Sequence, residues 1–565
     1  MTTIWMGFLI LLGLKSVPAD GERGNPFISV DPSGAGIEFR HFSGSTAVKE
    51  LIEIMGSGVA LLDYDGDGKL DIYFVNGASL PGLTKTDPTQ YNRLYHNEGS
   101  FRFSDVTAKA RVDGSGYGMG VACADYDNDS DTDIYVTQFG SNVLYRNNGN
   151  GTFTDVTAKA GVVTGGWSTS AAFIDVDRDG DLDLYVARYV DYHIGKGPYC
   201  GEREKGRASY CLPDLFPATH DVLYANNGDG TFRDVTATTG IGSVAGNSLG
   251  VSTGDIDSDG WPDIFVANDR TSNFLFHNKG DGTFEEVGVV SGIGYSADGL
   301  ARAGMGVDIG DFDHDLQPDI VVSNFEGEGL ALFKNLGELF FGDVAGEQRL
   351  HEATYPYVGF GVGWIDYDND SWLDLLLVNG HVLDDIEEYK PHIHFAQPGL
   401  LFRNRFGRLS QVDSPPGDAL ASPRVSRGAA FGDLDNDGRL DVVVQHHNGP
   451  PEILRNVVQG ENRSVLVTLR GTRSNYDAIG ARVTATVGGK RQRFEVKSAR
   501  SYLSHSDPRI HIGLGQTNKI ENLVISWPSG REQTVSNLAA GQGYVIQESS
   551  RGFKSFPLRT QQVSH

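Results

Sequence analysis

The sequence predicts an all-β fold, namely a seven-bladed β-propeller followed by a small β-sandwich domain. Three observations support this prediction. A nine-residue aspartate motif occurs seven times, an apolar run of strand length follows each copy, and a C-terminal region lacks the motif but alternates apolar and polar residues. Repeats spaced at the length of one four-stranded sheet are typical of propellers. The chain of 565 residues is long enough for both domains.

The repeated motif is D-x-D-x-D-x-x-x-D, and its copies are called loop 1 to loop 7 below. They begin at Asp63, Asp125, Asp175, Asp255, Asp311, Asp366 and Asp433, with successive starts 62, 50, 80, 56, 55 and 67 residues apart. This spacing fits one four-stranded blade per copy, with connections of variable length.

Patterns around each copy predict the four strands of a blade. A segment rich in small residues, such as GMGVACAD, precedes the aspartates, and an apolar run such as DIYVTQ follows them. Two further patterns, VLYRNNG and GTFTDVT in the second copy, complete the unit. We expect the Gly- and Ala-rich strand to be innermost because seven such strands crowd around a narrow axis.

The spacing of the aspartates predicts a calcium site in each loop. Carboxylates at positions 1, 3 and 5 of a tight loop point at one centre, position 7 offers a backbone carbonyl, and position 9 closes the cage. All-oxygen ligation suits Ca²⁺ better than Mg²⁺, and the absence of Cys and His from these positions disfavours zinc and copper. Solvated Asp/Gly turns are the alternative, which seven complete copies disfavour.

We expect one structural Ca²⁺ ion per loop, about seven in all, with five ligand residues each. In the order of the loops, these residues are Asp63, Asp65, Asp67, Lys69 and Asp71; Asp125, Asp127, Asp129, Asp131 and Asp133; Asp175, Asp177, Asp179, Asp181 and Asp183; Asp255, Asp257, Asp259, Trp261 and Asp263; Asp311, Asp313, Asp315, Gln317 and Asp319; Asp366, Asp368, Asp370, Trp372 and Asp374; Asp433, Asp435, Asp437, Arg439 and Asp441. Leu316 and Ser371 replace glycine at position 6 of loops 5 and 6, so these loops should bind more weakly if the turn requires a positive φ.

The formal net charge of −27 argues against a nucleic-acid partner, which needs a basic surface. Four carboxylates clustered in each loop repel one another when no cation is present. Ions that bind the folded loops and not the unfolded chain stabilise the fold by mass action. We therefore expect calcium to be structural.

The first residues predict export. Residues 5–14 are apolar and too short to span a bilayer, and Val17 and Ala19 suit cleavage after residue 19. No basic residue precedes this core, so a buried N-terminal strand or a misassigned start is the alternative. The sequence thus predicts a signal peptide over residues 1–19 and a secreted protein, extracellular or periplasmic, without a transmembrane segment.

The expected export guides the interpretation of the three cysteines. Cys200 and Cys211 flank an insertion in the third blade, and we expect them to form a disulfide rather than remain free thiols. Cys123 lies in an inner-strand segment and is expected to be a buried apolar residue.

With these motifs the chain resembles the FG-GAP repeats of the integrin α-subunit propeller, and more closely the secreted proteins of the cartilage acidic protein type. Residues 477–548 resemble the ASPIC/UnbV domain through DAIGARVTATVGG, SARSYLSHSDPRIHIGLG, LVISWPSG and GYVIQE. We accordingly divide the chain into a propeller over residues 25–458, an ASPIC/UnbV-like β-domain over 462–548 and a polar tail over 549–565. The basic residues of the β-domain could dock on the acidic propeller, bind an acidic glycan or simply be solvated.

A propeller fold does not determine function. No nucleophile elbow, P-loop or dinucleotide fingerprint occurs in a fitting context, and the His392 and His394 pair has no identifiable third ligand. No catalytic residue is predicted. The sequence favours a recognition or scaffolding protein that binds a protein or glycan outside the cytoplasm; the alternative is a calcium-dependent propeller enzyme, a polysaccharide lyase or glycoside hydrolase.

The seventh copy predicts how the ring closes. It supplies only three strands, whereas NPFISVDPSGAGIEF near the N-terminus matches the fourth-strand pattern GTFTDVTAKAGV. We therefore expect residues 27–30 to pair with residues 452–455, so that both ends of the propeller build one blade.

Overall fold

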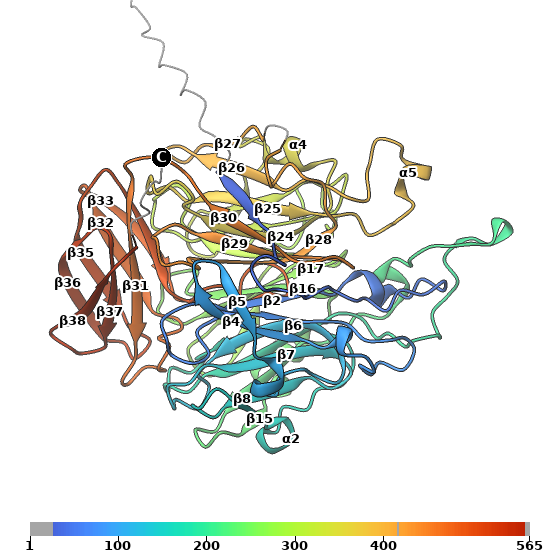
Figure 1. The fold of residues 1–565 in the computed structure, drawn as a ribbon, viewed down its shortest axis with the longest axis horizontal. Coiled ribbons are helices and arrows are strands. Elements are labelled where there is room, and N and C mark those ends of the chain that lie inside the picture. Colours follow the sequence, from blue (N-terminus) through green and yellow to red (C-terminus); the bar gives the residue numbers. More distant parts are fainter. Residues whose placement is uncertain (1–25, 415–416, 560–565) are drawn as a thin grey trace, which may run out of the picture.

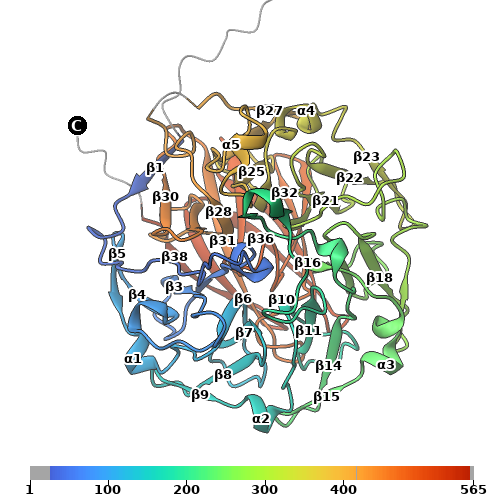
Figure 2. The same cartoon turned by 90° about the vertical axis from the view of Figure 1, so that its right-hand side faces the viewer.

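The computed structural model describes residues 26–414 and 417–559, so the predicted signal peptide over residues 1–19 lies outside the described residues. Seven four-stranded sheets each contain one aspartate loop. They follow one another as blades around a common axis (Figure 2), with the first strand of each blade innermost. The predicted all-β propeller is therefore confirmed.

Blades 1 to 4 follow the chain in order. Blade 1 consists of β2 (Val59–Leu62), β3 (Asp71–Phe74), β4 (Arg93–Gly99) and β5 (Arg102–Asp105). Blade 2 consists of β6 (Tyr117–Ala124), β7 (Asp133–Phe139), β8 (Val143–Asn147) and β9 (Phe153–Asp155). Blade 3 consists of β10 (Ser168–Ile174), β11 (Asp183–Arg188), β14 (Val222–Asn226) and β15 (Phe232–Asp234). Blade 4 consists of β16 (Ser248–Gly254), β17 (Asp263–Asn268), β18 (Phe274–Asn278) and β19 (Phe284–Glu286).

Blades 5 to 7 complete the ring. Blade 5 consists of β20 (Val307–Gly310), β21 (Asp319–Val322), β22 (Ala331–Asn335) and β23 (Phe341–Asp343). Blade 6 consists of β24 (Gly359–Ile365), β25 (Asp374–Asn379), β26 (Leu400–Asn404) and β27 (Leu409–Gln411). Blade 7 consists of β28 (Ser426–Gly432), β29 (Asp441–His446), β30 (Glu452–Asn456) and β1 (Phe27–Val30).

The closure prediction is confirmed. β1 pairs antiparallel with β30, with Phe27 opposite Asn456 and Val30 opposite Ile453. The Phe27 side chain is fully buried, and its ring centroid lies 6.4 Å from that of Tyr367 in blade 6. The N-terminal strand therefore fastens the last blade through both backbone pairing and core packing.

Helices are short and lie in the connections. The α-helices are α1 (Thr107–Ala110), α2 (Thr157–Ala160), α3 (Thr236–Thr239), α4 (Leu350–Thr354) and α5 (Ile386–Tyr389). The 3-10 helices are η1 (Leu51–Ile54), η2 (Pro88–Gln90), η3 (Arg203–Lys205), η4 (Pro213–Leu215) and η5 (Ile241–Ser243). Among the described residues, no helix combines the length and apolar character needed to cross a lipid bilayer.

The C-terminal domain consists of two four-stranded sheets. One has the order β34 (Ile510–Gly515), β31 (Arg463–Arg470), β37 (Gln542–Gln547), β38 (Phe553–Pro557); the other has β33 (Lys490–Glu495), β32 (Arg482–Val487), β35 (Lys519–Ser526), β36 (Glu532–Ala539). The prediction of a polar tail from residue 549 is wrong, because β38 pairs with β37. Its residues are mostly exposed, and this hid a strand at the edge of the sheet.

The two domains share one core. A single buried cluster joins Val465 and Ile512 of the C-terminal domain to Phe173 of blade 3 and Tyr126 of loop 2. Figure 1 shows the C-terminal domain, in orange and red, against one side of the propeller. We call this side, which carries the aspartate loops and lies at the left in Figure 1, the lower face. The opposite side, at the right in Figure 1, is the upper face.

A segment of the C-terminal domain enters the propeller axis. Residues 498–507 hydrogen-bond to inner strands: Leu503 O accepts from Val121 N at 3.1 Å, and His505 N donates to Val59 O at 3.0 Å. A Cβ atom on Gly58 would lie 2.0 Å from Leu503 O, so the inner strands need glycine partly to admit this segment. At the far end the Tyr502 hydroxyl donates to Met55 O at 2.7 Å, directly after η1.

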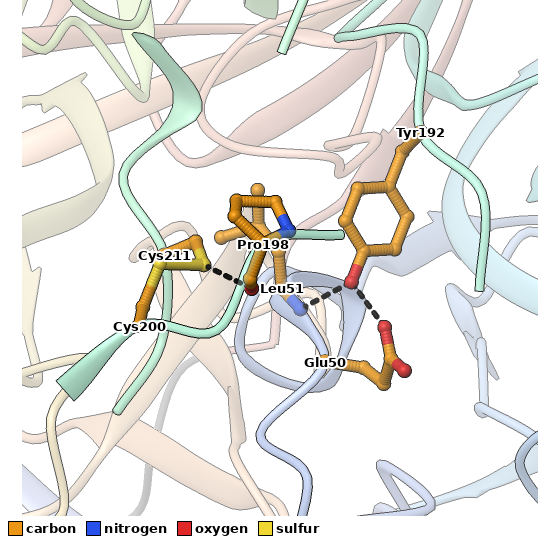
Figure 3. The surroundings of a disulfide bond; sticks show 6 residues. All are labelled: Glu50, Leu51, Tyr192, Pro198, Cys200 and Cys211. Atoms are coloured by element: carbon orange, nitrogen blue, oxygen red, sulfur yellow. Dashed lines mark hydrogen bonds between the residues drawn. A yellow bond between two sulfur atoms is a disulfide. The ribbon is translucent and has the colours of Figure 1, made fainter. Parts of the chain in front are cut away.

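The upper face carries the predicted insertion. Residues 193–216, called the arm, project with α5 away from the C-terminal domain (Figure 1) and contain the hairpin β12 (Gly201–Glu202) and β13 (Arg207–Ala208). Cys200 and Cys211 form the predicted disulfide, and Cys123 is free and buried as expected. Figure 3 shows how the base of the arm is held: the Tyr192 hydroxyl donates to Glu50 and accepts from Leu51 N at 3.2 Å.

Candidate metal centres

Each aspartate loop is a tight turn between the first and second strands of its blade. Position 6 has a positive φ in every loop, including the three residues that are not glycine: Ser130 (79°), Leu316 (71°) and Ser371 (77°). The turn therefore does require a left-handed residue at this position. Ser130 in loop 2 is thus a third exception to glycine at this position, in addition to Leu316 and Ser371.

The aspartate at position 9 holds the loop in shape through hydrogen bonds to two backbone amides. In loop 2 the Asp133 carboxylate accepts Tyr126 N at 3.2 Å and Asn147 N at 2.7 Å. The equivalent carboxylate accepts the corresponding pair of amides in all seven loops, for example Asp441 from Leu434 and Asn456. Position 9 thus fixes the shape of the loop and also points a carboxylate toward its centre.

The carboxylates converge as the spacing predicted. Oxygens of positions 1, 3 and 5 lie within 4.8 Å of one another in loop 1 (Asp63, Asp65, Asp67) and loop 3 (Asp175, Asp177, Asp179). In loop 2 the oxygens of positions 1, 3 and 9 do so, namely Asp125, Asp127 and Asp133. The ligand role of the position 7 carbonyls stays a prediction.

The electrostatics of the loops favour a bound cation. Burial raises the pKa of Asp71 and of Asp319 to about 8, although backbone hydrogen bonds oppose the shift. Burial, reinforced by repulsion from the carboxylates at positions 3 and 5, raises the pKa of Asp175 and of Asp311 to about 7. Charged carboxylates held this close are unstable without a positive charge among them.

Several of these oxygens also have no hydrogen-bond partner. They are both carboxylate oxygens of Asp175 and one oxygen each of Asp127, Asp255 and Asp311. Asp175 and Asp311 are each 3% exposed. A buried carboxylate oxygen without a donor is costly, and a hard cation is the partner that such an oxygen-only set fits.

Two histidines that the motif does not contain reach these sites. His96 Nδ1 lies 3.4 Å from Asp65 and 3.2 Å from Asp71, and His277 Nδ1 lies 3.5 Å from Asp257 and 3.2 Å from Asp263. Both come from the third strand of their blade. Loops 1 and 4 are therefore not surrounded by oxygen alone, and the only sequence signal was a His before the Asn of RLYHNEG and FLFHNKG.

A second residue type that sequence reasoning missed links the blades. Asn147, at the end of β8, donates through Nδ2 to Thr132 O in its own loop at 3.1 Å and to Tyr64 O of loop 1 at 2.8 Å. The equivalent asparagines of the other blades, Asn97, Asn226, Asn278, Asn335, Asn404 and Asn456, make the same two contacts. Their recurrence in all seven copies was the available signal.

The C-terminal domain lies directly on the loops, so its basic residues dock on the acidic propeller, one of the three roles left open. Arg482 forms an ion pair with Asp255, position 1 of loop 4, and Arg493 donates to Leu316 O in loop 5 at 3.1 Å. His511 contacts Gly438 O in loop 7 at 3.0 Å. The aspartate loops are thus interdomain contacts as well as turns.

The repeats and the C-terminal domain both match known families. FG-GAP-like repeats match residues 63–136, 125–186, 212–266 and 255–322, and the ASPIC and UnbV family matches residues 471–552. The chain is therefore an FG-GAP repeat protein with a C-terminal ASPIC and UnbV domain. Loops 6 and 7 lie beyond the matched repeats, but they form the same turn in the same four-stranded sheets.

Among named proteins the chain is similar to cartilage acidic protein 1. It is 30% identical to the human protein over 341 residues, covering 59% of this chain and 48% of the relative. It is 29% identical to the Xenopus tropicalis protein over 310 residues, covering 53% and 44%. The chain thus spans about half the length of these relatives. A solved structure described as YCF48 bound to D1 peptide aligns at 8% identity with a TM-score of 0.40, covering 77% of this chain and 98% of that one.

Proposed function

We propose that this chain is an exported calcium-binding protein that recognises or scaffolds a protein or glycan outside the cytoplasm. The observation that carries the calcium part is the buried, unpartnered carboxylate oxygens at the centres of the loops. The aspartates at positions 1, 3, 5 and 9 would hold one Ca²⁺ per loop. The ion would supply the positive charge that the converging carboxylates lack, and so keep the loops closed.

Export is supported by the chemistry of the arm. The Cys200–Cys211 disulfide suits an oxidising compartment, since thiols are kept reduced in the cytosol. The signal peptide over residues 1–19 stays a prediction from sequence. The similarity to cartilage acidic protein 1 points in the same direction, over about half the length of that protein.

The upper face is the surface that we propose for the partner. The lower face is covered by the C-terminal domain, and the axis is filled by Tyr502, Leu503 and residues of η1, which pack in one buried cluster. On the arm, Tyr199, Leu212 and Leu215 expose 43%, 53% and 56% of their surface. Exposed aromatic and apolar side chains on a projecting loop favour recognition. A filled axis disfavours catalysis there.

The test compares the whole protein with a variant in which a Gly-Ser linker replaces residues 199–212. Both are applied to glycan arrays and to panels of extracellular matrix proteins in calcium-containing buffer, and candidate polysaccharides are assayed for new reducing ends or unsaturated products. We expect saturable binding that the variant loses, without turnover. Turnover of a polysaccharide, or binding that survives loss of the arm, would contradict the proposal.

A further inference from the structure

The residue that precedes the bridging asparagine on the third strand of each blade faces the aspartate loop. In blades 1 to 7 it is His96, Arg146, Ala225, His277, Lys334, Arg403 and Arg455. Four of these side chains are Lys or Arg, two are His, and one is the methyl group of Ala225. The structure therefore offers seven nearly identical carboxylate sets with different built-in cations.

The basic members lie against their own loops. Lys334 Nζ pairs with Asp313 and lies 3.1 Å from Asp315 in loop 5, at positions 3 and 5. Arg403 lies 2.6 Å from Asp368 in loop 6, and Arg455 lies 3.0 Å from Asp435 in loop 7. Each of these carboxylates is a predicted calcium ligand, so a protein cation already neutralises part of the charge that would hold the ion.

Loop 3 differs from the other six. Ala225 contributes no charge, and both oxygens of Asp175 are buried without a hydrogen-bond partner. Arg178, inside the loop at position 4, is held away from the carboxylates: its Nε donates to Pro528 O at 2.8 Å, and its guanidinium lies 4.9 Å from the Trp261 ring centre. Arg233, which lies opposite Ala225 on β15, still acts on Asp177 at position 3. Loop 3 is thus the only loop of the seven whose third-strand position carries neither a basic residue nor a histidine.

We propose that the third-strand residue sets the calcium affinity of its loop, so that loop 3 binds first and loop 5 is among the last to fill. This inference depends on the proposed calcium function and adds an order to it. A cation beside the ligands repels an incoming Ca²⁺. In loop 5, Leu316 also has a left-handed backbone conformation, which is unfavourable for any residue other than glycine. The blade that carries the arm would therefore keep its ion longest as calcium falls.

The experiment exchanges the two residues. Calcium-stripped protein is titrated by isothermal calorimetry, and native mass spectrometry counts the ions bound at each calcium concentration. In the wild type, after correction for the statistical factors of seven sites, we expect the tightest loop to bind its ion roughly tenfold or more tightly than the weakest loop, the size of effect expected for one nearby charge. Ala225→Lys should weaken the first ion by roughly tenfold, and Lys334→Ala should strengthen one weak site by a similar factor.

Lys159→Ala, which removes the same charge from the exposed helix α2, is the matched control and should leave every step unchanged. Lys334→Ala only shortens a partly exposed side chain, so it keeps the test decisive if Ala225→Lys fails to fold. Seven equal intrinsic affinities, or a tightest site unaffected by Ala225→Lys together with weak sites unaffected by Lys334→Ala, would overturn this inference alone. A protein that binds no calcium would overturn the proposed function and this inference together.

Discussion

The lower and upper faces of the propeller are stabilised in different ways. On the lower face the same parts recur in every blade: an aspartate loop, a position 9 carboxylate and an asparagine that bridges to the preceding blade. On the upper face each contact occurs once, such as Tyr192 with Glu50, Tyr210 with Glu53 at 3.1 Å, and the disulfide of the arm. Contacts that recur in every blade therefore stabilise the ring, whereas contacts that occur once make the upper face different from blade to blade.

Removing calcium should have the largest effect, because it acts on all seven loops at once. Each ion at 100-fold saturation contributes about 2.7 kcal/mol to the free energy of unfolding. We expect excess EGTA to lower the melting temperature strongly and readdition of Ca²⁺ to restore it. Differential scanning calorimetry measures both changes. If melting is the same with and without chelator, the lower face is not stabilised by metal.

Tyr502→Ala should have the next largest effect, because this fully buried side chain connects the inserted segment to the upper face. Its ring centroid lies 4.9 Å from that of Phe360, and its hydroxyl donates to Met55 O. Loss of a buried aromatic ring costs about 3–5 kcal/mol. Tyr502→Phe, which removes the hydroxyl alone, should cost about 1 kcal/mol in denaturant titrations. Equal losses in the two variants would show that the ring does not pack as described.

Asn147→Ala tests one repeated part by itself. The substitution removes both Nδ2 contacts and leaves two buried carbonyls without this donor, so we expect a loss of about 2–4 kcal/mol. Asn148→Ala, its exposed neighbour, is the control and should stay within about 0.5 kcal/mol of wild type. A wild-type denaturation midpoint for Asn147→Ala would exclude the bridging role.

The arm should show the smallest global effect. Disulfides typically contribute about 2–4 kcal/mol by restricting the unfolded chain, but the arm projects from the ring and can open without unfolding it. We expect Cys200→Ser with Cys211→Ser to leave the melting temperature nearly unchanged and to speed limited proteolysis between residues 199 and 212. A large drop in melting temperature would mean that the upper face stabilises the whole ring.

The same contrast explains what the sequence could predict. Loops, blades and the closing strand were predictable because Asp133 has six counterparts along the chain, and Phe27 matches an outer-strand pattern that recurs. Cys200 and Cys211 were predictable because cysteine is rare here. These predictions needed only local chemistry and repetition.

The rest depends on contacts between segments far apart in sequence. Nothing in SARSYLSHSDPR indicates that Leu503 would enter the axis, because its partners are backbone atoms of distant strands. The pairing of Arg482 with Asp255 likewise follows from how the two domains dock. β38 was missed because its residues lie at a solvent-exposed edge, where apolar alternation is weak.

The most direct test of the calcium account is the metal content of the purified protein. Protein prepared without chelators and dialysed against metal-free buffer is analysed by inductively coupled plasma mass spectrometry, with the protein concentration fixed by amino-acid analysis. The account predicts close to seven Ca²⁺ per chain, one for each of the seven loops. Any ions that dialysis removes from weak loops should bind again when calcium is added back. A protein that contains no calcium and takes up none at millimolar Ca²⁺ would contradict it.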